Sequence, residues 1–98
     1  MIARIWRGAV APADTDAYVD YVRDTGIDHY RSTPGNAGAW ILHRQVGELT
    51  EIVTFSLWED MAAVRAFAGE DPDRAVYYPE DDRFLVERGD TVEHYDVD

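Results

Sequence analysis

The sequence contains no cysteine and no lysine, although its 98 residues include 20 acidic residues and 9 arginines. Without cysteine the chain forms no disulfide, thiolate nucleophile, iron–sulfur cluster or cysteine-bound zinc site. Without lysine it cannot form a Schiff base with a carbonyl substrate. These absences leave histidine, tyrosine, arginine and the carboxylates as the groups available for chemistry.

Positive charge is also scarce, since the formal net charge is −11. Such a balance argues against binding to nucleic acid or to anionic lipid. No apolar run approaches the roughly 18 residues of a membrane span. Residues 1–10 include Arg4 and Arg7 and have no separate apolar core, so no signal peptide is expected. We therefore expect a soluble, cytoplasmic protein with neither a nucleic-acid nor a membrane partner.

Length and composition predict a single domain over residues 1–98. The length lies near the common domain size of roughly 100–150 residues, and the hydrophobic fraction of 46% is too high for a disordered chain. There are no repeats, linkers or low-complexity segments. One modest core is therefore the expected architecture.

Hydrophobic periodicity predicts strands and helices in the order βαββααβ. Expected strands cover residues 2–7, 38–46, 51–58 and 91–97. Expected helices cover residues 12–30, 61–68 and 71–79, the last two beginning at the caps Asp60 and Asp71. This is the ferredoxin-like, split-βαβ order of an α+β protein, in which an antiparallel sheet carries helices on one face.

The sheet of such a protein has a second face that the helices leave open. Four large apolar side chains exceed what one thin helical layer can cover: Ile5, Trp40, Phe55 and Trp58. Large exposed apolar patches usually mark an interface. We therefore expect a two-fold homodimer in which two sheets pack together.

Two stretches of the sequence resemble a known family. Residues 54–67, TFSLWEDMAAVRAF, resemble the strand, Trp-Glu-Ser and helix segment of the antibiotic biosynthesis monooxygenase family. Residues 34–40, PGNAGAW, resemble that family's Pro-Gly turn into the second strand, and residues 74–80 and 92–97 are similar to small members. The resemblance covers nearly the whole chain and implies the dimeric α/β barrel of that family.

The resemblance also implies a range of functions. Some members oxidise aromatic phenols to quinones without metal or flavin, whereas others degrade haem, isomerise or cyclise small molecules, or have no known activity. Haem-degrading members usually carry tryptophan where Phe67 stands, histidine where Tyr77 stands and asparagine near Trp6 or Arg7, and this sequence has none of these. We therefore expect a cofactor-independent enzyme that oxidises a phenol or quinol. A non-enzymatic protein that binds or senses a small molecule is the alternative, and a haem-binding, isomerase or cyclase role is less favoured.

Phenol oxidation needs a base, a group that stabilises the anion and an aromatic wall. Histidine titrates near neutral pH, so His43 or His29 is the predicted base, with structural and helix-capping roles as their alternatives. Arg4, Arg44 and Arg65 are the candidate anion stabilisers, with pairing to acids at the dimer seam as the alternative for Arg4 and Arg44. The predicted substrate-binding side chains are Trp58, Tyr77, Trp40, Phe67 and Arg4. No spacing of ligands typical of a metal site occurs, so we expect no metal.

Other polar residues receive structural roles at this stage. His94 lies in an acidic strand, which favours a surface or dimer contact. Asp71, Asp73, Asp81 and Asp82 are interpreted as helix caps and solubilising charges. On a helix, the adjacent Tyr77 and Tyr78 would point about 100° apart, so only Tyr77 is expected to face the sheet.

Overall fold

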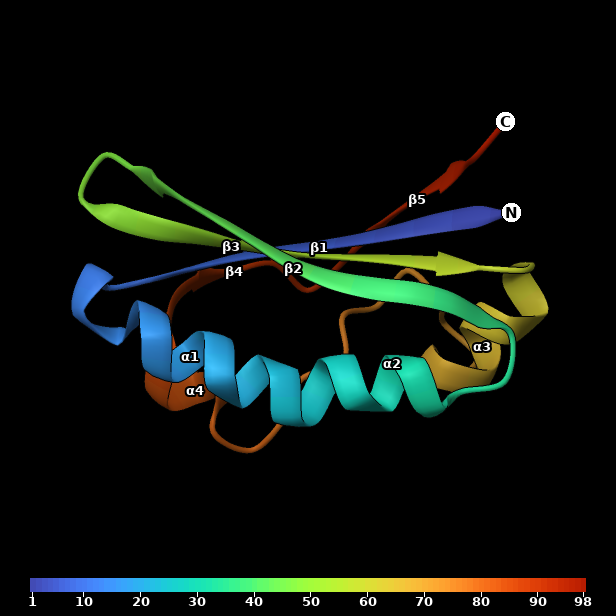
Figure 1. Ribbon diagram of the computed structural model, residues 1–98, viewed down its shortest axis with the longest axis horizontal. Helices are drawn as coiled ribbons and strands as arrows, with labels where there is room; N and C mark the ends of the chain where they lie inside the picture. The colour runs from blue at the N-terminus through green and yellow to red at the C-terminus, as the bar shows by residue number, and fades with distance from the viewer.

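The computed structural model describes all residues from 1 to 98 and contains one antiparallel sheet. Strand β1 spans Ile2–Val10, and β2 (Asn36–Val46) and β3 (Leu49–Trp58) form a long hairpin. Two short strands follow near the end of the chain, β4 (Leu85–Arg88) and β5 (Glu93–Asp96). The strand order is β2-β3-β1-β4, and β5 also pairs with β1, so β4 and β5 form two halves of one edge strand (Figure 1).

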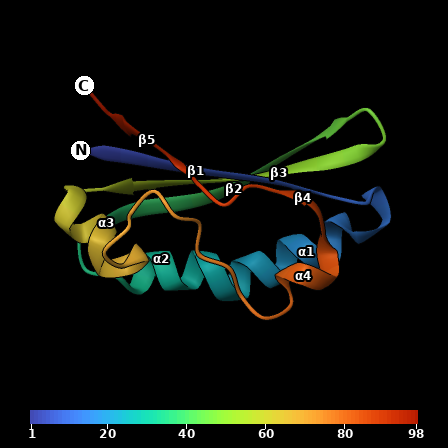
Figure 2. The ribbon, with the colours of Figure 1, turned by 180° about the vertical axis from the view of Figure 1, so that it is seen from behind.

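Helices cover only one face of this sheet, as both ribbon views show (Figures 1 and 2). The first helical segment joins a 3₁₀ turn, η1 (Pro12–Asp14), to α1 (Thr15–Val22), a π-helical stretch, η2 (Arg23–Ile27), and α2 (Asp28–Ser32). Helix α3 (Met61–Ala68) follows β3, and the one-turn helix α4 (Asp81–Phe84) precedes β4. The architecture confirms the predicted α+β, ferredoxin-like fold class. No helix has the length and apolar character needed to cross a membrane.

The alternation along β3 explains how this sheet builds a core. Ile52, Thr54, Ser56 and Trp58 are buried beneath the helices, and the residues between them face the other side. Buried side chains of β1, α1, α2 and α3 complete the layer, including Val10, Tyr18, Tyr30 and Phe67. Trp58 therefore belongs to the covered face, and of the four large apolar side chains Ile5, Trp40 and Phe55 remain for the open face. The position of Trp58 follows from the two-residue period of the strand.

Helix α3 begins as predicted. The side chain of Asp60 accepts a hydrogen bond from the backbone N–H of Ala63 at 2.9 Å. This bond satisfies one of the amides left free at a helix start. The helix ends at Gly69, whose φ of +91° lies in the region that favours glycine.

The predicted helix over residues 71–79 is wrong, because residues 69–80 form an irregular, largely extended segment. We call this segment the strap. The N–H of Ala75 donates to the carbonyl of Asp90 and the N–H of Val92 donates to the carbonyl of Asp73, both at 2.8 Å. These pairings across the chain replace the helical bonds that the Asp-Pro start predicts. The helix begins ten residues later instead, at Asp81.

The strand boundaries also differ from the prediction at both ends of the chain. Strand β1 continues through Gly8 to Val10, three residues beyond the predicted end. The predicted strand over residues 91–97 is shorter, because β5 covers Glu93–Asp96, and β4 has no counterpart in the prediction. The break between β4 and β5 is where the strap pairs with residues 90–92.

Candidate functional site

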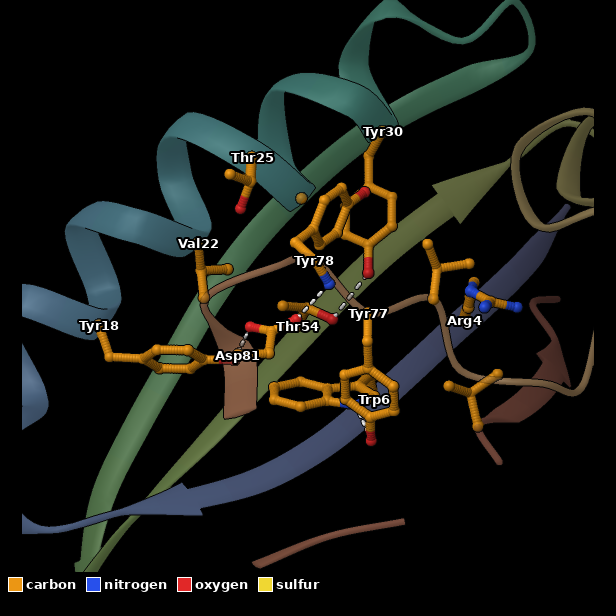
Figure 3. A pocket seen from close by; sticks show the side chains of 13 residues that line it. Arg4, Trp6, Tyr18, Val22, Thr25, Tyr30, Thr54, Tyr77, Tyr78 and Asp81 are labelled. Atoms are coloured by element: carbon orange, nitrogen blue, oxygen red, sulfur yellow. Dashed lines mark hydrogen bonds between the residues drawn. The ribbon is translucent and has the colours of Figure 1, made fainter. Parts of the chain in front are cut away.

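A pocket lies between the inner face of the sheet and the first helical segment, closed on one side by the strap (Figure 3). We call it the inner pocket. Its empty volume is about 380 Å³ including the open mouth, but the part that can hold water amounts to only about 20 Å³. Such a space accepts about one water molecule. The lining residues are Arg4, Trp6, Tyr18, Val22, Thr25, Gly26, Tyr30, Thr54, Val76, Tyr77, Tyr78, Asp81 and Val92.

Arg4 provides the positive charge of the inner pocket. It is only 2% exposed, yet it forms no ion pair with any carboxylate. Its two terminal nitrogens donate to the strap carbonyls of Pro72 and Arg74, and its Nε has no hydrogen-bond partner. Burial lowers the pKa of Arg4 from its usual range. A buried guanidinium without a counter-ion is costly and favours an anion as a partner.

Trp6 and Tyr77 form an aromatic wall below Arg4. Their rings meet edge to face with 6.2 Å between centroids, and Trp6 Nε1 donates to the Tyr77 hydroxyl at 3.2 Å. The Tyr77 hydroxyl in turn donates to the carbonyl of Gly89. Gly8 is needed beside this wall, because a Cβ there would lie 2.7 Å from the Trp6 ring. This close approach explains why a glycine stands inside β1 rather than at its end.

Two hydroxyls, those of Tyr30 and Thr54, meet in the middle of the inner pocket. They lie 3.2 Å apart, and both residues are buried. Burial raises the pKa of Tyr30, so its phenol stays protonated. The π-helical stretch η2 places Thr25 and Gly26 on the pocket lining. Single π-helical turns of this kind are frequent at functional sites.

Asp81 provides the negative charge of the inner pocket. It is 4% exposed, and its carboxylate accepts from the Tyr18 hydroxyl at 2.9 Å and from the backbone N–H of Tyr78 at 2.6 Å. Burial raises the pKa of Asp81, although these two hydrogen bonds oppose the shift. In the view of Figure 3, Asp81 and Arg4 lie on opposite sides of the Tyr30–Thr54 pair. The pocket thus holds a buried acid and a buried cation that do not neutralise each other.

His94 contacts Arg4 but does not line the inner pocket. Its Nε2 lies 3.0 Å from Arg4 Nη1, and its Nδ1 lies 3.0 Å from the Asp73 carboxylate. Burial lowers the pKa of His94, and Asp73 opposes this effect. The strap, β1 and β5 therefore meet at one hydrogen-bonded cluster next to the inner pocket.

Two of the residues predicted for the site, Arg4 and Tyr77, line the inner pocket. Phe67 and Trp58 lie in the adjoining core, where Phe67 packs 5.5 Å from the Arg4 guanidinium. Tyr78 also lines the pocket, because in the extended strap both adjacent tyrosines reach it. The expectation that only Tyr77 faces inward depended on the helix that does not form.

The remaining predicted residues lie elsewhere. His43 and Arg44 are exposed on β2, and Arg44 forms an ion pair with Glu51 at 2.9 Å. Trp40 is 47% exposed and packs on Phe55 on the open face. His29 is exposed on α2 and contacts the Tyr78 hydroxyl at 2.7 Å from outside the pocket. Trp40 and His43 line a separate, open pocket between β2 and the first helical segment. The structure does not bring all four residues together, and their roles in a site stay predictions.

Sequence reasoning missed Asp81, Tyr30 and Thr54. The signal for Asp81 was weak, because a carboxylate beside Asp82 near a turn usually caps a helix. Thr54 carried a better signal, since it alternates with buried positions of β3. A polar residue on the buried face of a strand needs a partner, and that requirement points to a polar site. No group of three or more histidine, aspartate or glutamate side chains is placed to hold a metal ion.

Comparison with known proteins supports the fold. No model of a sequence family matches the chain, and no curated protein matches it. Among solved structures, a candidate antibiotic biosynthesis monooxygenase of Bacillus cereus aligns with a TM-score of 0.61 at 20% identity, covering 97% of this chain and 87% of that chain.

Two further solved structures are similar. The MhuD heme-degrader of Mycobacterium tuberculosis aligns with a TM-score of 0.58 at 18% identity, over 99% of this chain and 95% of that chain. A monooxygenase from the gene ActVA-Orf6 of Streptomyces coelicolor, in complex with Nanaomycin D, aligns with a TM-score of 0.52 at 22% identity. That alignment covers 72% of this chain and 62% of that chain. The chain therefore has the ferredoxin-like fold of antibiotic-biosynthesis-monooxygenase-type proteins, as its sequence resemblance predicts.

Proposed function

We propose that this protein is a small monooxygenase-like enzyme that binds a phenol or quinol as its anion in the inner pocket and oxidises it with dioxygen. The observation that carries the proposal is the buried Arg4 guanidinium, which has no carboxylate partner and an unpartnered Nε in an aromatic-lined pocket. A phenolate oxygen placed beside Arg4 would supply the missing counter-charge. Preorganised donors of this kind are usually the largest electrostatic contribution to catalysis.

Asp81 is our proposed base. Its raised pKa makes the ionised carboxylate a better proton acceptor than an ordinary aspartate. The Tyr18 hydroxyl and the Tyr78 amide hold the carboxylate in one orientation. Trp6, Tyr77 and Tyr78 would flank a flat ring. This assignment replaces a histidine base with a carboxylate, because no histidine lines the pocket.

The proposed reaction balances for a phenol whose para carbon carries hydrogen. The phenol binds as its phenolate with the oxygen beside Arg4, its proton having passed to solvent, and it gives electrons to dioxygen, which forms a bond to the para carbon. Asp81, on the other side of the Tyr30–Thr54 pair, then takes the proton of that carbon. Loss of the proton from that carbon and cleavage of the O–O bond then give a quinone and one water molecule. One oxygen atom enters the ring and the other leaves with the two protons. The substrate supplies the reducing power, so the proposal needs no metal or flavin.

Oxygen uptake with a panel of phenols and hydroquinones tests this function. We expect uptake with at least one phenol, and a fall in kcat/KM of about 100-fold in both Arg4→Gln and Asp81→Asn. Arg7→Gln is the matched control for Arg4, because Arg7 is on the same strand and is exposed and paired with Glu93. Uptake that is unchanged in Arg4→Gln would contradict the proposal.

Non-enzymatic binding of the same class of molecule is the second candidate. Both candidates require the pocket to widen, since only about 20 Å³ can hold water before any rearrangement. The two candidates separate with 4-nitrophenol, whose phenolate absorbs visible light. Binding that depends on Arg4, together with no oxygen uptake for any phenol, would favour the binding protein over the enzyme.

Haem does not fit the residues of the inner pocket. None of the three histidines lines it, and the Tyr77 oxygen is already engaged by Trp6 and Gly89. Asp81 would also place a carboxylate against the porphyrin. The similarity to the MhuD heme-degrader thus extends to the fold, and we propose no step through haem.

We also propose that the protein is a homodimer, joined through the open face of the sheet. Trp40 and Leu42 on β2 are 47% and 53% exposed, and they stand beside Phe55 and Val53 of β3. This apolar face is flanked by the ion pairs Arg44–Glu51 and Arg7–Glu93. A second copy of the same face would cover the apolar centre and place opposite charges around it.

A further inference from the structure

The Arg4 end of the inner pocket depends on a residue that does not line it. Arg4 Nη1 lies 3.0 Å from His94 Nε2, and the His94 side chain is only 11% exposed. Arginine carries N–H donors and no acceptor, so His94 Nε2 must accept this hydrogen bond. His94 is therefore neutral here, with its proton on Nδ1, and it donates that proton to Asp73.

Protonation of His94 would reverse this contact. A histidinium has a donor on each ring nitrogen, so Nε2–H would then face an N–H of Arg4, and two positive charges would lie 3.0 Å apart. Arg4 from β1 and Asp73 from the strap are the charged groups that face His94. Asp73 favours the histidinium but is itself exposed, which weakens its attraction.

The Arg4 guanidinium also holds the strap through two hydrogen bonds. Nη1 donates to the carbonyl of Pro72, and Nη2 donates to the carbonyl of Arg74. Displacing the guanidinium would release both carbonyls at once. The strap carries Val76, Tyr77 and Tyr78 of the pocket lining, so its release would widen a pocket that now has room for about one water molecule.

We propose that His94, oriented by Asp73, is a positioning residue for Arg4, and that protonation of His94 frees Arg4 from the strap and opens the inner pocket. The consequence for ligand binding rests on the proposed function, in which Arg4 holds the anion. The opening itself is a property of the protein without ligand. The opening of the pocket and the binding of an anion at Arg4 can therefore be tested, and refuted, separately.

Amide hydrogen exchange between pH 5 and 8 tests the opening. The reporters are the backbone amides of Ala75 and Val92. The Ala75 amide donates to the carbonyl of Asp90 and the Val92 amide donates to the carbonyl of Asp73, so both join the strap to residues 90–92. Protection factors remove the intrinsic pH dependence of exchange. We expect protection at both amides to fall on acidification, by about tenfold for each unit that separates the His94 pKa in the closed and open forms. The amide of Glu59, bonded to Gly35, should stay constant.

Variants assign this transition to His94. In His94→Gln the transition should vanish, because the amide side chain does not titrate. In Asp73→Asn it should move to lower pH, because the carboxylate that favours the histidinium is gone. In His29→Gln it should persist, although His29 contacts the strap through Tyr78. The amide of Glu59 reports any overall loss of stability in a variant, so the pH at which the strap amides change is compared with that reference.

A flat wild-type profile, a transition that survives in His94→Gln, or a shift to higher pH in Asp73→Asn would overturn the proposal. Binding of 4-nitrophenol separates it from the proposed function. If the exchange transition occurs but Arg4→Gln leaves nitrophenolate affinity unchanged, the positioning role of His94 stands and the assigned ligand site fails. If affinity depends on Arg4 but not on pH in the range of the transition, the ligand site stands and the positioning role of His94 fails.

Discussion

The two faces of the sheet come from the same strands and yet have opposite character. On the inner face, Trp58 is fully buried and its Nε1 donates to Ser56 at 2.9 Å, while Arg4 reaches the polar centre of the inner pocket. On the outer face, Trp40 and Leu42 are about half exposed, and no helix covers that face of the sheet (Figure 1). The inner face therefore encloses polar groups within a packed core, whereas the outer face presents apolar groups to its surroundings. We therefore expect ligand binding on the inner face and association with a second copy on the outer face.

The strongest test of this contrast is the removal of one tryptophan from each face. Trp58→Ala should lower the free energy of unfolding by about 3–5 kcal/mol, because it leaves a cavity against Tyr30 and Phe67. Trp40→Ala should cost much less, because Trp40 is 47% exposed. Urea denaturation at fixed protein concentration measures both. Equal losses would contradict the distinction between the faces.

A charge on the outer face tests association. Leu42→Glu should raise the dimer dissociation constant at least tenfold, since it would bury an unpaired carboxylate in the proposed apolar interface. Analytical ultracentrifugation measures this change. Glu48→Gln is a suitable control because it alters charge in the exposed hairpin turn. A wild-type protein that sediments as a monomer would refute the dimer.

The buried acid of the inner face should leave a mark on stability against pH. Because the pKa of Asp81 is raised in the folded protein, the folded state binds more protons than the unfolded state over the interval between the two pKa values. Its contribution to stability is therefore present below the unfolded pKa and is lost as pH rises through the folded pKa. Relative to Asp81→Asn, wild type should lose stability over this interval. Chemical denaturation of both proteins at several pH values measures the difference, and parallel curves would argue against the shift.

The smallest effect is expected at the edge of the outer face. Arg44 and Glu51 form an ion pair in which the Arg44 side chain is 72% exposed. Such pairs contribute little, so Arg44→Gln should change the free energy of unfolding by no more than about 0.5 kcal/mol. The same denaturation assay checks this. A loss well above that value would show that the pair is held more rigidly than its exposure indicates.

Much of the fold could be predicted because local patterns carry it. The alternation of Ile52, Thr54, Ser56 and Trp58 marks a strand with one buried side, and Asp60 marks the start of α3. The strap could not be predicted in this way. Asp71-Pro72 is a good local helix start, but hydrogen bonds from residues 73–75 to residues 90–92 outweigh it. Such bonds join segments well separated along the chain and leave no local periodicity.

The candidate site was less predictable than the fold. Arg4 and Tyr77 were singled out from the sequence and do line the inner pocket, whereas Asp81 was interpreted as a cap. The base predicted from residue type was a histidine, because histidine titrates near neutral pH in water. The structure places neither His43 nor His29 on the lining of the inner pocket, whereas Asp81 lines it and burial raises the pKa of that carboxyl. Residue type sets the ordinary pKa, and the surroundings set its value in the protein.

By itself, the sequence determined the order of strands and helices from β1 to α3, the single antiparallel sheet and the limited chemical repertoire of a chain without cysteine or lysine. These follow from hydrophobic period and composition, which are local properties. Only the tertiary structure decided that Arg4, Asp73 and His94, which lie up to 90 residues apart, form one cluster. It also decided that Asp81 faces the same pocket as Arg4. The physical reason is that burial and pairing across the chain, rather than residue type, set which charges meet and which stay unpaired.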